Sequence, residues 1–395
     1  MIPLFKVFMA PTAKEKVGEV LDSGYIGQGP KVDEFEKQLG EYFGNEKVVT
    51  VNAGTSALHL ALHLLKKEKP YWMKDVFDGV AFVEANWPGI QDGDEVLATP
   101  LTCTASNWPI VANNLKIKWV DIDPTTLNMD LEDLERKMTP KTKAIMGVHW
   151  GGYPLDLDKI RKIQANFRKS FGWAPALIED GAHSIGTKYK GKYLGNHGNF
   201  VMNSLQAIKH ITSVDGGLLY CPHDELYERA KLVRWYGIDR NPKGRTDFRC
   251  EADIPEWGFK FHMNDVCAAV GMENFKHLDE IVSKHKENAA YYDEHLQNVD
   301  GVTLLKREKG FESAFWIYTL LVDDRPSFYK HMEKCGVTVS QVHERNDKHS
   351  CMAEFKTELP NLEKTIGKVV SIPVGWWVTE DERKHIVESI KNWKK

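Results

Sequence analysis

From Asp92 onward, short apolar runs alternate with amphipathic segments, and this alternation limits the fold more than any other feature. The apolar runs have the length of strands and the near-continuous hydrophobicity of strands that are buried on both faces. The predicted strands are Glu95–Thr99, Ile117–Asp123, Ala144–His149, Ala176–Glu179, Phe200–Leu205 and Gly217–Cys221. The segments between them, such as Asp130–Lys137 and Asp156–Arg168, have helical periodicity. The pattern predicts a three-layer α/β domain with a mainly parallel sheet, which binds its ligand beyond the carboxyl ends of the strands.

The 395 residues are too many for one small domain. We assign residues 1–255 to the large domain and residues 256–395 to a smaller C-terminal α+β domain, in which predicted strands mix with helices. Residues 66–91 interrupt the alternation with aromatic residues among charges and glycines. We therefore predict an insertion at about 66–91.

Composition narrows the function classes. A formal net charge of −4 gives no reason to expect nucleic acid or an anionic membrane as a partner. No apolar window has the length of about 18 residues that a membrane helix requires. The six cysteines are dispersed and form no CxxC pair, which predicts neither a disulfide framework nor a metal site. These features predict a cytoplasmic enzyme.

A first candidate site follows the predicted strand Val48–Val51. A turn of small residues, which includes Gly54, Thr55 and Ser56, leads there into a strongly helical run. A strand, a small-residue turn and a helix present free backbone N–H groups to an anion, and the helix dipole adds to the attraction. The alternative is an ordinary helix cap made by Thr55 or Ser56. Because no Walker lysine is present, a nucleoside triphosphate site is not predicted.

A second candidate site combines Asp180, at the end of a predicted strand, with Lys209, which follows the next strand. Pyridoxal phosphate (PLP) requires a carboxylate beside its pyridine nitrogen and a lysine that can reach its aldehyde. Both residues lie in suitable places of the predicted sheet. Spacing alone, however, favours Lys209 as one of the many lysines that carry a solvated surface charge.

A series of motifs occurs in the order typical of one enzyme family. The motifs are Gly24-Tyr-Ile-Gly-Gln-Gly-Pro30, Asn52-Ala-Gly-Thr-Ser-Ala-Leu58, Asp121-Ile-Asp123, Val148-His-Trp-Gly-Gly152, Ile178-Glu-Asp-Gly-Ala-His183, Ser204-Leu-Gln-Ala-Ile-Lys-His-Ile-Thr212 and Gly216-Gly217. Together they resemble the DegT/DnrJ/StrS sugar aminotransferases, which are PLP enzymes of fold type I. The resemblance is clear over about residues 20–275 and looser beyond.

The resemblance implies a role for each matched residue. Lys209 would hold PLP as a Schiff base and act as the acid and base, while Asp180 would pair with the ring nitrogen. His183 would pack near the phenolic oxygen, unless it is simply a core histidine. The backbone N–H groups of Thr55 and Ser56 would hold the phosphate, and Gly54 would allow its close approach. Ser204 would add a hydroxyl group, unless it is only a turn residue at a strand end.

Two departures from the family pattern concern cofactor contacts. Cys103 stands where an aromatic ring usually stacks on PLP, and Trp108 is a possible replacement. Lys260 stands where an asparagine of the partner subunit commonly reaches the phosphate; a lysine would suit a phosphate, or it could be an ordinary surface residue. The segment 257–265 around Lys260 resembles the loop that contacts the partner subunit, so the resemblance implies a homodimer.

The identity of the Schiff-base residue separates two enzyme classes. In sugar dehydratases of the family a histidine replaces the lysine, and here His210 follows Lys209 directly. The serine–lysine spacing from Ser204 favours Lys209, and thus an aminotransferase. A PLP- or PMP-dependent dehydratase and a non-catalytic PLP-binding regulator are the alternatives.

The resemblance implies a keto-sugar substrate, by default linked to a nucleotide, and glutamate as the amino donor, in amino-sugar and polysaccharide biosynthesis. One group of basic residues could contact a diphosphate, or it could be a solvated loop; the group is Arg234, Arg240, Lys243, Arg245 and Arg249. A second group could line a sugar pocket, or it could be aromatic core; the group is Trp316, His343, Arg345, Trp376 and Trp377.

Overall fold

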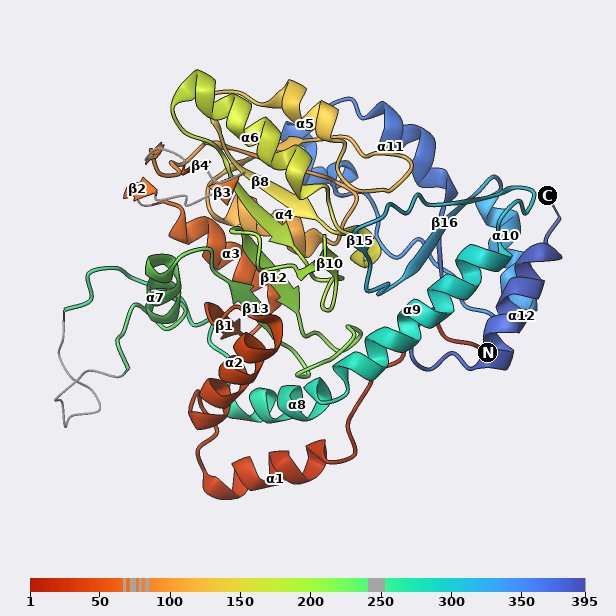
Figure 1. Cartoon of the computed structure of the whole chain (residues 1–395), viewed down its shortest axis with the longest axis horizontal. Coiled ribbons are helices and arrows are strands. Elements are labelled where there is room, and N and C mark those ends of the chain that lie inside the picture. Colours follow the sequence, from red (N-terminus) through yellow and green to blue (C-terminus); the bar gives the residue numbers. More distant parts are fainter. Residues whose placement is uncertain (67–68, 72–75, 78–79, 82–84, 241–252, 395) are drawn as a thin grey trace.

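The computed structural model describes residues 1–66, 69–71, 76–77, 80–81, 85–240 and 253–394. A seven-stranded sheet forms the centre of the larger part of the molecule (Figure 1). In spatial order, its strands are β1 (Val48–Val51), β13 (Gly217–Tyr220), β12 (Phe200–Ser204), β9 (Ala176–Asp180), β8 (Thr142–Val148), β6 (Glu95–Ala98) and β7 (Lys116–Trp119). From β12 to β7 all neighbours are parallel, whereas β13 runs antiparallel to both β12 and β1. The expected mainly parallel sheet is confirmed.

Helices cover both faces of this sheet, and its strands are therefore buried almost throughout. One hydrophobic cluster combines sheet residues with α3 (Gly54–Leu64), α4 (Thr104–Ala112) and α7 (Asp224–Val233). A second cluster on the other face combines sheet residues with α2 (Pro30–Phe43), α5 (Leu131–Lys137), α6 (Leu157–Phe171), α8 (Asp265–Phe275) and the start of α9 (Leu278–His295). Two helical layers around one sheet give the predicted three-layer architecture.

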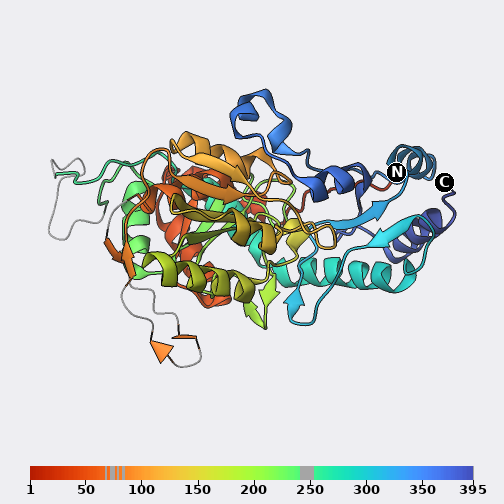
Figure 2. The same ribbon diagram turned by 90° about the horizontal axis from the view of Figure 1, so that it is seen from above.

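The C-terminal residues form a third hydrophobic cluster around a three-stranded antiparallel sheet. The sheet contains β14 (Val302–Leu304), β16 (Tyr318–Val322) and β17 (Val369–Ile372). The helices α10 (Arg325–Lys334) and α12 (Glu380–Lys391) pack beside it, and α9 (Leu278–His295) extends from α8 to this part (Figure 2). Ile2 also belongs to this cluster and pairs with Val337. The boundary at residues 255 and 256 stays a prediction.

The remaining elements are short. The small strands are β2 (Lys69–Tyr71), β3 (Val76–Phe77), β4 (Val80–Ala81), β5 (Ala85–Trp87), β10 (Lys188–Tyr189), β11 (Lys192–Tyr193) and β15 (Phe311–Glu312). The small helices are α11 (Pro360–Thr365), η1 (Trp150–Gly152), η2 (Asn346–Lys348), η3 (Ser350–Phe355) and η4 (Ile366–Lys368). The helix α1 (Ala13–Ser23) packs against α8. Within the predicted insertion, β2 pairs with β5 and β3 with β4, both antiparallel.

One predicted strand is too long. The run Ile117–Asp123 was expected to be extended throughout, but β7 ends at Trp119. Beyond it, the Asp121 carboxylate accepts backbone N–H groups from Ile122, Asn361 and Leu362, which draws the chain out of the sheet. Apolarity alone could not reveal these distant partners.

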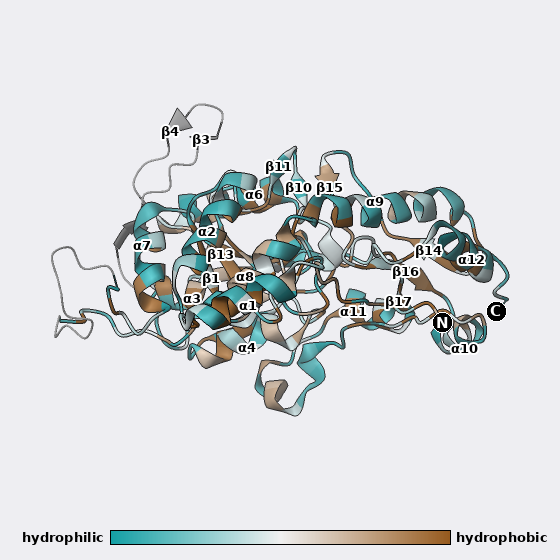
Figure 3. Ribbon diagram, turned by 90° about the horizontal axis from the view of Figure 1, so that it is seen from below, coloured by the Kyte–Doolittle hydropathy of each residue, from teal (hydrophilic) through white to brown (hydrophobic). Residues whose placement is uncertain are grey.

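Hydropathy follows the layers: α9, with one side buried and the other exposed, carries mainly hydrophilic residues, and the hydrophobic residues concentrate toward the interior (Figure 3). In the part of the chain that the structure describes, every helix is too short or too polar to cross a lipid bilayer.

Candidate active site

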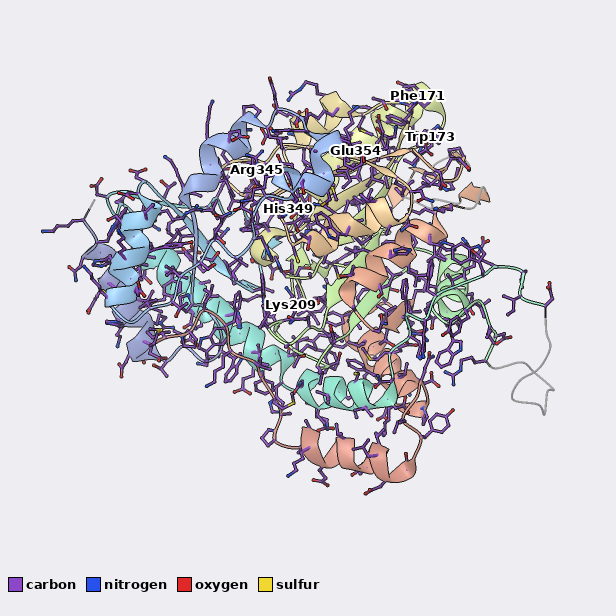
Figure 4. The ribbon with its side chains drawn as sticks, turned by 180° about the vertical axis from the view of Figure 1, so that it is seen from behind. Phe171, Trp173, Lys209, Arg345, His349 and Glu354 are labelled. Carbon is purple, nitrogen blue, oxygen red and sulfur yellow. The ribbon has the colours of Figure 1, made fainter. Side chains whose placement is uncertain are left out.

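Lys209 lies in a compact turn that connects β12 to β13. The Leu205 carbonyl closes this turn by accepting the Ser213 N–H at 3.0 Å and the Thr212 hydroxyl at 2.9 Å, and the Leu205 N–H donates to Gly216. Figure 4 places Lys209 near the middle of the molecule, between the central sheet and the C-terminal elements. The turn therefore holds the lysine at the carboxyl end of β12, where a ligand of such a sheet is expected.

The Lys209 amine lies against an aromatic ring: its Nζ is 3.7 Å from the centre of the Trp316 ring. Burial lowers the pKa of this amine to about 8, although the charges of Asp180 and Cys103 act in the opposite direction. About a tenth of the amine is therefore neutral at pH 7, far more than for an ordinary lysine, and the neutral form is the nucleophile.

Asp180 ends β9 and is buried. Its Oδ2 accepts the Ser106 hydroxyl at 2.5 Å, and its Oδ1 accepts the Ala182 N–H at 3.0 Å. Burial raises the pKa of the Asp180 carboxyl, whereas these two hydrogen bonds and the nearby Lys209 amine lower it. Among the described residues, no cationic side chain forms an ion pair with Asp180, so the carboxylate is free to meet a cation on a ligand.

Three parallel rings form a wall beside Lys209. The His183 ring stacks on Trp316, with centroids 3.9 Å apart, and on His343, with centroids 5.4 Å apart. The Gly151 N–H donates to His183 Nδ1 at 3.3 Å, which leaves the His183 proton on Nε2, 3.4 Å from His343 Nε2. Burial lowers the pKa of both histidines far below the usual range, and the Lys209 charge adds to this effect. Both rings are therefore neutral.

The helix α3 begins without a side-chain cap, because Ala53 occupies the N-cap position. The alternative of an ordinary cap by Thr55 or Ser56 is wrong: the Ser56 hydroxyl donates to the Asn52 side chain instead. The first N–H groups of α3 thus remain available to an anion. A Cβ on Gly54 would lie 3.2 Å from the Ser204 Cβ, so glycine brings this helix end against the end of β12.

Cys103 and Lys260 have different relations to Lys209. Cys103 is the N-cap residue of α4, and it lies close enough to Lys209 to raise the pKa of the amine. Trp108, the suggested replacement for an aromatic ring at Cys103, packs edge-on against His349; among the described residues the ring against Lys209 is that of Trp316. The Lys260 side chain is exposed, and its carbonyl accepts the Asn52 side-chain amide at 3.3 Å.

The candidate diphosphate residues include one that is already engaged. Arg234 is buried and forms a salt bridge with Glu36 and a 2.8 Å hydrogen bond to the Thr50 carbonyl, so it is a structural residue. Arg240 donates to the Gln28 carbonyl at 2.8 Å. Arg234 and Arg240 line a cavity of about 890 Å³ that shares no lining residue with the Lys209 cluster. The other three candidates, Lys243, Arg245 and Arg249, lie outside the described residues.

The second group of candidates separates in the same way. Trp316 and His343 lie beside Lys209, whereas Trp376 packs edge-on against Phe8 and Trp377 against His285. Trp376 therefore packs against the second cluster, beside the central sheet, and Trp377 against the third cluster in the C-terminal part. Arg345 pairs with Asp347 and Glu363 and lies on the segment that follows His343 (Figure 4).

Replacing Arg234 by methionine is expected to lower the free energy of unfolding by about 3–5 kcal/mol, because it leaves the Glu36 carboxylate largely buried without its cation. Urea denaturation measures this loss. The matched control is Lys231→Met on the same helix, where an exposed pair with Glu228 is removed and a change within about 0.5 kcal/mol is expected. Equal losses in the two variants would contradict the structural role of Arg234.

Ser106 is a site residue that sequence reasoning missed. Its hydroxyl lies between Asp180 and Thr102, 2.7 Å from the Thr102 hydroxyl. The four-residue spacing of Thr102 and Ser106 at the start of a helix was a weak signal that could have indicated a shared face.

Comparison with known proteins identifies the family. The model of the DegT/DnrJ/EryC1/StrS aminotransferase family matches residues 9–71 and 81–391. The chain belongs to this aminotransferase family. The gap between the two matched ranges, residues 72–80, falls within the predicted insertion. The prediction of a PLP-dependent aminotransferase of fold type I is thereby confirmed.

Individual relatives of this aminotransferase match over nearly their whole length. The crystal structure of AtS13 from Actinomadura melliaura is 48% identical, with a TM-score of 0.90, and the match covers 99% of this chain and 98% of AtS13. The sugar aminotransferase CalS13 from Micromonospora echinospora is 44% identical, with a TM-score of 0.90 and 99% of both chains covered. The spore coat polysaccharide biosynthesis protein SpsC from Bacillus subtilis is 28% identical over 394 residues, covering 96% of this chain and 93% of SpsC.

The aminotransferase has groups that fit each part of PLP. Among the described residues the buried Asp180 carboxylate forms no ion pair, and the uncapped start of α3 offers N–H donors beside Ser204. The Lys209 amine has a lowered pKa, as a nucleophile requires. When bound, PLP supplies an aldehyde and an electron-withdrawing ring. The roles of the individual residues follow as proposals.

Proposed function

We propose that this aminotransferase transfers an amino group from L-glutamate to a keto-sugar that is linked to a nucleotide, in cytoplasmic amino-sugar and polysaccharide biosynthesis. The observation that carries the proposal is the buried Lys209 amine of lowered pKa, whose charge interacts with that of the buried Asp180 carboxylate in an aminotransferase fold. The description of CalS13 as a sugar aminotransferase supports the keto-sugar, and the description of SpsC supports polysaccharide biosynthesis.

In this proposal, Lys209 holds the cofactor covalently between the two halves of the reaction and moves a proton at the substrate carbon. Asp180 keeps a proton on the ring nitrogen by its negative charge, while Ser106 and the Ala182 N–H fix the carboxylate in place. The N–H groups of Thr55 and Ser56, next to Gly54, and the Ser204 hydroxyl hold the phosphate.

We assign two uncharged rings, His183 and Trp316, to positions beside the cofactor. His183 packs near the phenolic oxygen, and the Trp316 ring takes the place of the aromatic side chain that Cys103 lacks. Because Gly151 already donates to His183 Nδ1, the Nε2–H is the single proton that His183 can offer.

His210 supports transamination over dehydration. In the dehydratase alternative a histidine replaces the lysine, but the His210 ring is buried and its Nε2 bonds to the Ala314 carbonyl at 2.9 Å. The Lys209 amine, in contrast, lies close enough to Asp180 and Cys103 for their charges to raise its pKa. The geometry thus favours Lys209 as the residue that meets the cofactor.

We also propose a homodimer in which the segment 257–265 completes the partner's site through Lys260. Trp257 is 65% exposed, and the neighbouring Phe259 and Phe261 rings stack at 4.6 Å, which leaves an aromatic surface of the kind that interfaces cover. A monomer that keeps full activity on dilution would contradict this assembly.

Incubation of the PLP-loaded enzyme with glutamate alone is expected to yield 2-oxoglutarate in an amount stoichiometric with the chain. Adding a panel of nucleotide-linked keto-sugars is then expected to yield one product in which an amino group replaces the keto oxygen, as read by mass spectrometry. The same sugars without a nucleotide form the control. A keto-deoxy-sugar without net amino transfer would indicate a dehydratase, and no reaction with any amino donor would indicate a PLP-binding regulator.

A further inference from the structure

Two hydrogen bonds connect the lysine turn to the C-terminal part on either side of Lys209. The Trp316 Nε1–H donates to the Ile208 carbonyl at 2.8 Å. The His210 Nε2 lies 2.9 Å from the Ala314 carbonyl, and because a carbonyl only accepts, this nitrogen carries the proton. The residues before and after Lys209 are thus both hydrogen-bonded to the strip of residues 313–316. This strip carries the Trp316 ring, which lies against the Lys209 amine.

A second histidine, contributed by α9, supports the same strip. His285 Nδ1 donates to the Phe315 carbonyl at 2.7 Å, and the His285 and His210 rings lie 4.7 Å apart. In the described part of the chain the remaining nitrogens, His210 Nδ1 and His285 Nε2, are buried without a partner. Burial lowers the pKa of both histidines, that of His285 to about 4. Each is therefore a neutral ring that donates its one proton to a backbone carbonyl.

The strip, residues 313–316, requires such support. Phe315 has a φ of +48°, a left-handed conformation that is unfavourable for a bulky residue and persists only where surrounding contacts hold it. On the other side, the Ala314 N–H donates to the Thr187 hydroxyl at 3.1 Å. A Cβ on Gly152 would lie 3.1 Å from the Phe315 nitrogen, so the strip is packed closely there as well.

We propose that His210 and His285 are positioning residues, which hold the strip 313–316 and, through it, the Trp316 ring against the Lys209 amine. The ring keeps water away from the amine, so these two histidines act on Lys209 without touching the reacting atoms. The proposal rests on the proposed role of Lys209. The titratable groups whose charges act on the amine or respond to it are Asp180, Cys103, His183, His343 and His210. Of these only His210 changes in the variants below, and because burial lowers its pKa well below the usual value, its replacement removes a neutral ring rather than a charge.

The test measures how readily Lys209 reacts in the full-length chain prepared without PLP. A trace of a small acetylating reagent is added across a range of pH, and the modified Lys209 peptide is quantified by mass spectrometry. In the unmodified protein the rate is expected to reach half its maximum near pH 8, the pKa of the buried amine. In His210→Leu and in His285→Leu the ring moves and water reaches the amine, so the pKa rises. The first unit of that rise lowers the neutral fraction, and with it the rate at pH 8, by about fivefold, and each further unit by about tenfold.

Three further variants make the result specific. His210→Gln retains an N–H donor at a similar place and is expected to titrate as the unmodified chain does. His331→Leu, which removes another histidine bond to a backbone carbonyl, far along the chain in α10, is expected to have no effect. In the Trp316→Ala background, His210→Leu is expected to add no further shift, since His210 acts through the ring.

An unchanged Lys209 titration in a folded His210→Leu variant would overturn the proposal, as would a shift of the same size in His331→Leu. If His210→Leu does not fold, the comparison of His285→Leu with the Trp316→Ala, His285→Leu double variant decides in the same way. Because the labelling requires no cofactor, its outcome is separate from the failure of the proposed function, which would appear as a PLP-loaded enzyme without amino transfer.

Discussion

Replacing Lys209 by alanine is expected to lower kcat for amino transfer by about 10⁴-fold or more, because the same amine holds the cofactor and moves the proton. The visible absorbance of the loaded enzyme, expected at roughly 410–430 nm for a lysine-bound cofactor, should be lost in the same variant. Spectra and glutamate turnover, measured on one preparation, check both expectations.

The control for this variant is Lys192→Ala, which removes an exposed lysine at the tip of β11. It should leave the spectrum and turnover unchanged. If Lys209→Ala retains the absorbance band, another lysine holds the cofactor and the assignment of Lys209 is wrong.

Replacing Asp180 by asparagine is expected to lower kcat roughly 10- to 10³-fold, because the negative charge that holds the ring-nitrogen proton is lost. The fold should persist, since an asparagine oxygen can still accept the Ala182 N–H and its amide can donate to the Ser106 hydroxyl. Stopped-flow measurement of the reaction with glutamate, followed by a thermal melt, separates the loss of activity from any loss of stability.

Glu179→Gln is the matched control, because it removes a buried carboxylate from the adjacent position of β9. Glu179 pairs with His149 at 2.9 Å and accepts the Asn199 amide at 2.7 Å, away from Asp180. This variant should lose stability but retain its rate with glutamate. A rate loss in Glu179→Gln that equals the loss in Asp180→Asn would refute a specific role for Asp180.

Local pattern predicted most of the fold. The apolar runs that became β6, β8, β9, β12 and β13 were found within two residues of their ends, because strands buried on both faces leave a continuous hydrophobic signal. The order of motifs led to the family. Asp180 and Lys209 could be placed at one edge of the sheet because parallel strands bring their carboxyl ends together.

The parts that could not be predicted depend on long-range contacts. Nothing near Lys209 in the sequence indicates that Trp316, from another part of the fold, supplies the ring beside it. Likewise, the run of arginines resembles a phosphate site, yet Arg234 is engaged by Glu36, a residue of α2. Cysteine at position 103 indicated that the usual ring is missing, but not that Trp316 is the residue we propose in its place.

The close contact at the start of α3 has a consequence for biosynthesis of the protein. A Cβ on Gly217 would lie 2.6 Å from the Gly54 nitrogen, and β1, the first strand of the sheet in chain order, pairs with β13, the last. The proposed phosphate cradle therefore cannot exist on a nascent chain until β13 has left the ribosome. Binding of PLP by this enzyme would therefore indicate that the central sheet is complete. Fragments truncated before Gly217 should not retain PLP during gel filtration.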